Sequence, residues 1–200
     1  MGRGMLRCPG PPSDTAMAPT LIRKGMDELF PQSRRTKGKH VSHAIYDIMK
    51  SIYPDKYQDT PIDIVRANLG NALEKTLIRG MHERDPRRYA IPGELEHEDW
   101  YGTPDLWDTV DWRTIEFKMT WASSRRAADI EDEWFWRYWV QLKAYCRMGQ
   151  MTKGGLYICF VNGDYTRDGS PGGAPTVMGW HDEWDEDELT ENWEMLKARC

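Results

Sequence analysis

The sequence predicts an α/β domain in which a central mixed β-sheet is flanked by helices. Two helical segments precede a stretch of short strands, and a third helix separates two longer strands. The strand expected over residues 114–120 is joined through that helix to an apolar strand expected over 155–161, and such a crossover permits parallel pairing. A chain of 200 residues with 40% hydrophobic residues can bury a core without disulfide bonds.

The N-terminal part is expected to be a tail followed by two helices. Residues 1–19 are rich in glycine and proline, so we expect a disordered tail and a single domain over residues 20–200. Apolar residues at helical spacing predict a helix over 41–52. A second helix is expected over 61–82, beginning with a proline. Its apolar stripe consists of Ile62, Val65, Leu69, Leu73, Leu77 and Met81.

Three short strands are expected over residues 89–120, separated by turn-rich segments near 99–102 and 108–111. The last strand alternates in character, which predicts two different faces. One face carries Ile115, Phe117 and Met119, and the other carries Glu116, Lys118 and Thr120. Glutamates 94, 96 and 98 also alternate, and we interpret them as a solvent-facing strand edge.

The C-terminal half is expected to contain two helices and two strands. An aromatic-rich helix is predicted over 131–148, ended by Gly149, and its tryptophans are interpreted as core residues. The apolar run at 155–161 predicts a strand that is buried on both faces. A further strand is expected over 176–181 and a last helix over 186–198, which begins with carboxylates at the positive end of the helix dipole.

The net charge of −5 is unevenly distributed. Residues 161–200 carry three basic and ten acidic residues, whereas residues 1–160 carry 24 basic and 22 acidic residues. Contacts with nucleic-acid phosphates depend on local patches, so the acidic total does not exclude them. The basic residues at 34–39 and Arg125 with Arg126 are interpreted either as phosphate contacts or as solvated loops.

The spacing of the cysteines and the hydropathy of the chain indicate the cellular compartment. None of the four cysteines forms a CxxC pair, which argues against a zinc or iron–sulfur site and favours a reducing compartment. No apolar stretch reaches the about 18 residues of a membrane span. We therefore expect a cytoplasmic protein that does not associate with membranes.

Three residues carry the chemistry that the sequence predicts. Asp105 and Glu116 are 11 residues apart, so two adjacent strands can bring them together, and Lys118 shares a face with Glu116. Converging carboxylates repel each other unless a cation lies between them. Mg²⁺ prefers oxygen ligands of this kind, and the backbone carbonyl of Phe117 can supply a further one. A lysine beside that ion can orient or deprotonate an attacking water. The pattern predicts hydrolysis of a phosphodiester.

These residues also resemble a known family. Pro104-Asp105 with Glu116-Phe117-Lys118 is similar to the motif of the PD-(D/E)XK nuclease superfamily, more closely its RecB-type and phage lambda-type exonuclease branches. The segment Gly70–Glu74 resembles the upstream helix of that family, and Gln141–Tyr145 resembles its Q-x-x-x-Y motif. The resemblance covers residues 41–162. The chain lacks the cysteine cluster that the iron–sulfur members of this family carry.

The resemblance implies a restriction-endonuclease-like core and a full set of site residues. The implied metal ligands are Glu74, Asp105, Glu116 and the carbonyl of Phe117. The implied catalytic residues are Asp105, Glu116, Lys118, Gln141 and Tyr145, of which the last two support the orientation of the lysine or the substrate. The cofactor would be Mg²⁺, with Mn²⁺ as a substitute.

The activity implied is that of a Mg²⁺-dependent deoxyribonuclease, an exonuclease of phage-type recombination or DNA processing. DNA is the expected partner. The same resemblance implies that the chain forms a homo-oligomer and works with a single-strand annealing protein. For a phage-encoded chain, it implies a location in the host cytoplasm. Two alternatives stay open: a non-catalytic DNA-binding or assembly factor on a nuclease-like fold, and a structure-selective endonuclease or junction resolvase.

Overall fold

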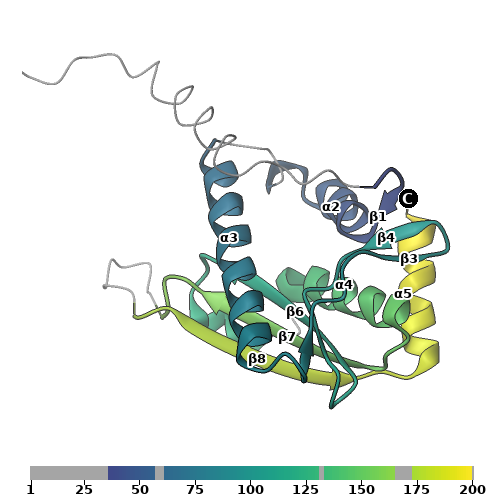
Figure 1. The fold of residues 1–200 in the computed structure, drawn as a ribbon. Helices are drawn as coiled ribbons and strands as arrows, with labels where there is room; N and C mark the ends of the chain where they lie inside the picture. The colour runs from purple at the N-terminus through teal and green to yellow at the C-terminus, as the bar shows by residue number, and fades with distance from the viewer. Residues whose placement is uncertain (1–35, 57–60, 131–132, 165–172, 200) are drawn as a thin grey trace, which may run out of the picture.

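The computed structural model describes residues 36–56, 61–130, 133–164 and 173–199 (Figure 1). The tail predicted over residues 1–19 lies outside them. The elements, in chain order, are β1 (Lys39–His40), α2 (Val41–Ile52), η1 (Pro54–Lys56), α3 (Pro61–Arg84), β2 (Tyr89–Ala90), β3 (Leu95–His97), β4 (Trp100–Gly102), β5 (Leu106–Asp108), β6 (Arg113–Thr120), η2 (Ser124–Asp129), α4 (Glu133–Gly149), β7 (Lys153–Phe160), β8 (Thr176–Glu183) and α5 (Glu186–Ala198). The predicted α/β class, a mixed sheet flanked by helices, is confirmed.

The larger sheet has five strands in the order β2-β5-β6-β7-β8. Strands β6 and β7 pair in parallel, with Phe117 opposite Tyr157, and α4 forms the predicted crossover between them. The other neighbouring strands pair in antiparallel fashion. The pairing of β5 with β6 ends at Leu106 and Ile115. Among the described residues, β6 therefore continues from Glu116 onward without a strand partner on that side.

Helix α3 covers one face of this sheet, and α4 covers the other, with α5 beside it (Figure 1). On the α3 face, the buried side chains of Leu106, Ile115 and Phe117 contact the C-terminal half of the helix. On the opposite face, Leu156, Ile158 and Phe160 of β7 pack against buried residues of α4 and α5. Strand β6 is thus held between two helices, which is the arrangement that positions the site.

A second sheet of three strands, in the order β1-β4-β3, corrects the turn predicted near 99–102. The turn consists of Glu98 and Asp99, which have φ angles of 49° and 63°, and the next three residues form β4. Trp100 is buried against Trp193 of α5, so burial of this ring makes a strand of residues predicted as a turn. Glu94, Glu96 and Glu98 are exposed, which agrees with the predicted solvent-facing edge.

The apolar stripe predicted on α3 is wrong at two of its members. Leu69 is 44% exposed and Leu73 is 41% exposed. In this half of the helix, Gly70 and Glu74 face the sheet instead, because an added Cβ at Gly70 would lie 3.7 Å from Met119 and Glu74 bonds to the same residue. A polar side chain therefore occupies a position where periodicity alone expects a core residue.

The C-terminal elements follow the prediction closely. The last helix begins with a capping box in which Asp185 and Glu188 satisfy each other's backbone amides. Helix α4 includes Gly149, and the left-handed residue that follows is Gln150, with φ 55°, so the predicted stop is displaced by one residue. Cys146 and Cys159 are buried and form no disulfide bond. No helix in the described part of the chain has the length and apolarity of a membrane span.

The two halves of α3 are predicted to differ in their contribution to stability. Leu77→Ala removes a side chain that packs against the Leu106–Phe117 cluster, so we expect it to lower the free energy of unfolding by about 1–3 kcal/mol. Leu73→Ala, one turn away and exposed, is the matched control, with an expected change within about 0.5 kcal/mol. Urea denaturation measures both. Equal losses would contradict the observed orientation of α3.

Candidate active site

The candidate site is built on the unpaired part of β6. The backbone amides of Phe117 and Met119 lie on the side of the strand that β5 no longer covers. Oδ2 of Asp105 accepts a hydrogen bond of 2.7 Å from the Phe117 amide, and Oε1 of Glu74 accepts one of 3.1 Å from the Met119 amide. Two carboxylates, one from the loop before β5 and one from α3, are thereby fixed beside the same strand edge.

Pro104 explains why the sheet opens at this point. Continuing the register of β5 and β6 by two residues places Pro104 opposite Phe117 and Asp105 opposite Glu116. Proline has no amide hydrogen, so it cannot donate to the carbonyl of Phe117. Because the N–H and C=O of one strand residue point to the same side, this carbonyl faces the same edge as the Asp105 carboxylate.

Glu116, which is buried, and Lys118, which is partly buried, form an ion pair on the α4 face of β6. Glu116 is only 2% exposed, and its Oε1 accepts a hydrogen bond of 2.5 Å from Nζ of Lys118. Its second oxygen, Oε2, is buried without a hydrogen-bond partner among the described residues. Leaving such an oxygen unsatisfied costs about 1–3 kcal/mol or more. A cation or donor that reaches this oxygen would remove the penalty.

The charges at the site are unbalanced. Burial raises the pKa of Glu116 to about 8, and the neighbouring Asp105 adds to the effect. Burial also raises the pKa values of Glu74 and Asp105, against the influence of Lys118. Burial opposes the charge on Lys118, but the surrounding carboxylates outweigh it, so the lysine pKa lies above its ordinary value. When ionised, the three carboxylates outnumber Lys118, the lysine whose charge acts on all three, and this favours an added cation.

The donor set fits a hard divalent cation. The described residues contain no group of three or more His, Cys, Asp or Glu side chains that is arranged to hold a metal ion by itself. Mg²⁺ rarely needs such a cage, because it is usually bound by one or two carboxylates and keeps several waters. Asp105, Glu116 and the carbonyl of Phe117 supply oxygen ligands of that kind, and the unsatisfied oxygen of Glu116 belongs to this set.

Helix α4 closes the site on the other face. Nε2 of Gln141 donates a hydrogen bond of 2.9 Å to the hydroxyl of Tyr145, so the two residues meet on one helix face as expected. Burial and the Glu116 carboxylate raise the pKa of Tyr145, which keeps its hydroxyl protonated. Tyr138 was missed as a site residue, although it lies three positions before Gln141. Nζ of Lys118 is 6.0 Å from the centre of its ring.

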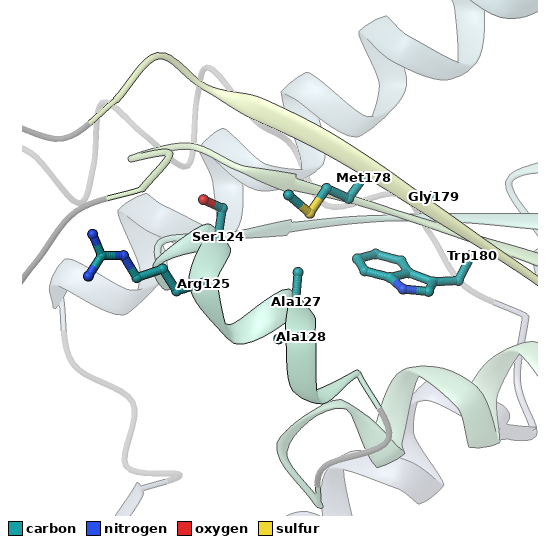
Figure 2. Close-up of a pocket in the computed structure, with 7 residues that line it drawn as sticks. All are labelled: Ser124, Arg125, Ala127, Ala128, Met178, Gly179 and Trp180. Carbon is teal, nitrogen blue, oxygen red and sulfur yellow. The ribbon is translucent and has the colours of Figure 1, made fainter.

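The basic residues that follow β6 lie at a different place. A cavity of about 590 Å³ lies between η2 and β8. Met178 and Trp180 point toward it, while the guanidinium of Arg125 points away (Figure 2). Arg125 pairs with Asp164. This cavity is lined by none of the predicted site residues. Of the basic residues at 34–39, Arg34 and Arg35 lie outside the described residues, and Lys37 and Lys39 are exposed.

Comparison with known proteins places the fold. The alkaline exonuclease from Laribacter hongkongensis has a similar structure, with a TM-score of 0.51 at 15% identity over 81% of this chain and 85% of that one. Its complex with dAMP gives a TM-score of 0.51 at 14% identity over the same shares. A phage-related exonuclease from Haemophilus somnus 129PT has a TM-score of 0.43 at 11% identity over 92% and 79%. No family model and no curated protein matches. The chain therefore shares an α/β fold with the alkaline exonuclease.

Proposed function

We propose that this chain is a metal-dependent DNA nuclease of the PD-(D/E)XK type. The observation that carries the proposal is the convergence of Glu74, Asp105, Glu116 and Lys118 at one unpaired strand edge. The fold shared with an alkaline exonuclease supports it, as does the dAMP that the related enzyme binds. A surface ladder of ion pairs would not need to bury the Glu116 side chain, which is only 2% exposed.

The chain's own residues would divide the work of hydrolysis. Asp105, Glu116 and the Phe117 carbonyl would hold the cation, and Glu74 would add negative charge beside it. When bound, Mg²⁺ lowers the pKa of an attacking water and offsets charge on the phosphate. Lys118 would donate hydrogen bonds that orient this water and stabilise the pentavalent phosphate. Its raised pKa supports the role of a charged donor over that of a general base.

Gln141 and Tyr145 would act as positioning residues. The Tyr145 hydroxyl is buried and lies within electrostatic reach of Glu116 and Lys118. The amide of Gln141 fixes the direction of that hydroxyl through a hydrogen bond of 2.9 Å. The pair would thus limit the rotamers of the Glu116–Lys118 pair from the α4 side. Removing either residue is expected to weaken catalysis without removing a metal ligand.

The shared fold also supports an exonuclease over the alternatives, namely a non-catalytic DNA-binding factor and a junction-selective endonuclease. The intact set of Asp105, Glu116 and Lys118 supports catalysis. Phage-type recombination or DNA processing in a host cytoplasm, a homo-oligomeric state and a single-strand annealing partner stay predictions that belong to the same proposal.

An exonuclease is expected to degrade only DNA that has ends. The full chain should digest linear DNA with Mg²⁺ or Mn²⁺ and should leave covalently closed single-stranded and plasmid circles intact. Gel analysis of matched linear and circular substrates measures this, with chelator as the control. Cleavage of circles would favour the endonuclease, and binding without cleavage of any DNA would favour the non-catalytic factor.

Lys118→Ala is expected to lower the rate of cleavage by about 10²–10⁴-fold, because it removes the donor that orients and stabilises the reacting groups. The substitution should leave the circular dichroism spectrum unchanged. Lys197→Ala is the matched control and should retain full activity, since this lysine of α5 pairs with Glu98 of the β3–β4 turn and with Glu194 of its own helix. Full activity of a folded Lys118→Ala protein would overturn the mechanism.

Metal affinity is expected to rise with pH. The pKa of Glu116 is about 8, so near pH 6.5 a bound cation must displace a proton, whereas at pH 8.5 most of the carboxyl is ionised. We expect Mn²⁺ to bind roughly tenfold or more tightly at pH 8.5 than at pH 6.5 by isothermal titration calorimetry. Glu116→Gln should bind weakly at both values. Equal affinity of the unchanged chain at the two values would contradict the proposed ligand role.

A further inference from the structure

A cavity beside Glu74 is not used by the proposed reaction. It has a volume of about 390 Å³ and lies between the N-terminal half of α3, the end of β6 and the start of α4. Its lining includes Arg66 and Glu74 of α3, Trp121 after β6, and Arg137 and Tyr138 of α4. Tyr138 also lies over Lys118, with 6.0 Å between Nζ and the ring centre, so the cavity adjoins the buried charges.

We propose that this cavity is a subsite for one unpaired nucleotide of the DNA strand being cut, and this inference rests on the proposed function. Arg66 and Arg137 would contact the phosphate, and Trp121 would stack on the base. The subsite would therefore require the strand to be single-stranded where it enters the cavity.

The charge of the lining fits a phosphate. The cavity combines two arginines with one carboxylate, in contrast to the acidic cluster next to it. The Arg137 guanidinium is held in place, because its Nη2 donates a hydrogen bond of 2.9 Å to the Tyr138 hydroxyl and its Cζ lies 4.7 Å from the centre of that ring. Arg66 is exposed and free to reach an entering ligand. Planar guanidinium groups bind phosphate oxygens in a bidentate manner.

Trp121 has the properties of a stacking platform. Its side chain is half-buried, so one part of the ring system is supported while another is accessible. Its backbone is fixed, because Nδ2 of Asn162 donates a hydrogen bond of 3.2 Å to the Trp121 carbonyl. The next amide, that of Ala122, bonds to Oγ1 of Thr120 at 3.1 Å. A partly exposed aromatic ring on a fixed backbone can give sequence-tolerant stacking with a single base.

The size of the cavity indicates how much of a DNA strand it can hold. A volume of about 390 Å³ is near the lower end of small-ligand pockets, which span about 300–1,000 Å³. It is large enough for one nucleotide, whose base would have to leave the stack of its neighbours to lie on Trp121. Because Glu74 belongs both to this lining and to the acidic cluster, the nucleotide would lie next to the scissile phosphate.

The test measures binding of a fluorescent 12-nucleotide single strand by anisotropy, in Mg²⁺ and in the Lys118→Ala background, with the length of the DNA checked on a gel. Trp121→Ala should weaken binding by about 5- to 100-fold. Arg66→Gln should weaken it by about 3- to 20-fold, with a smaller salt dependence. The matched controls Trp112→Ala and Arg79→Gln, at exposed positions outside the cavity, should change binding by less than twofold.

A set of oligonucleotides with single abasic sites separates stacking from a general loss of structure. At one position, removal of the base should weaken binding to the parent protein but not to Trp121→Ala. Equal effects of Trp121→Ala and Trp112→Ala, or no measurable binding of the strand by the parent, would overturn the subsite. Failure of the unchanged chain to cleave any DNA would instead overturn the proposed function, so the two failures are distinguishable.

Discussion

The burial of Glu116, which is paired with the partly buried Lys118 and lies near two further carboxylates, is the constraint on which the rest of the structure depends. Like charges in a low-dielectric interior repel each other, and each ionised group also loses its hydration. The fold offsets part of this repulsion and lost hydration with the charge of Lys118 and with hydrogen bonds from two backbone amides of β6. It leaves one oxygen of Glu116 unsatisfied. Such local destabilisation is characteristic of sites that bind a cation or a reacting group.

An open strand edge is the means by which the fold gathers these groups. Exposed edges are normally protected, because their unpaired amides invite pairing with other chains. Here Asp105 and Glu74 satisfy the amides that β5 leaves uncovered, so protection of the edge and assembly of the site are one arrangement. The helices on the two faces then supply the remaining groups, with Glu74 from α3 and Tyr145 from α4.

Sequence analysis predicted the elements whose signals are local. Helical spacing located α2, carboxylates at the helix start accompanied the prediction of α5, and an unbroken apolar run located β7, within a few residues. Local signals failed where tertiary contacts determine the secondary structure. Trp100, for example, lies in a strand rather than in the predicted turn, because its ring is buried against Trp193. The alternation of β6 and the spacing from Asp105 indicated how these side chains would meet, whereas Glu74 and Tyr145 needed the family resemblance. The lining of the cavity beside Glu74 comes from three separate elements, so no spacing along the chain could have shown it.

The most direct measurement is a crystal structure of the full chain grown with Mn²⁺, with anomalous scattering used to locate the metal. The account predicts a peak at the open edge of β6, about 2.0–2.3 Å from carboxylate oxygens of Asp105 and Glu116. The Phe117 carbonyl should be a third ligand, and waters should complete the coordination. A saturated crystal with no peak at this edge, or with Glu116 still bound only to Lys118, would contradict the central claim.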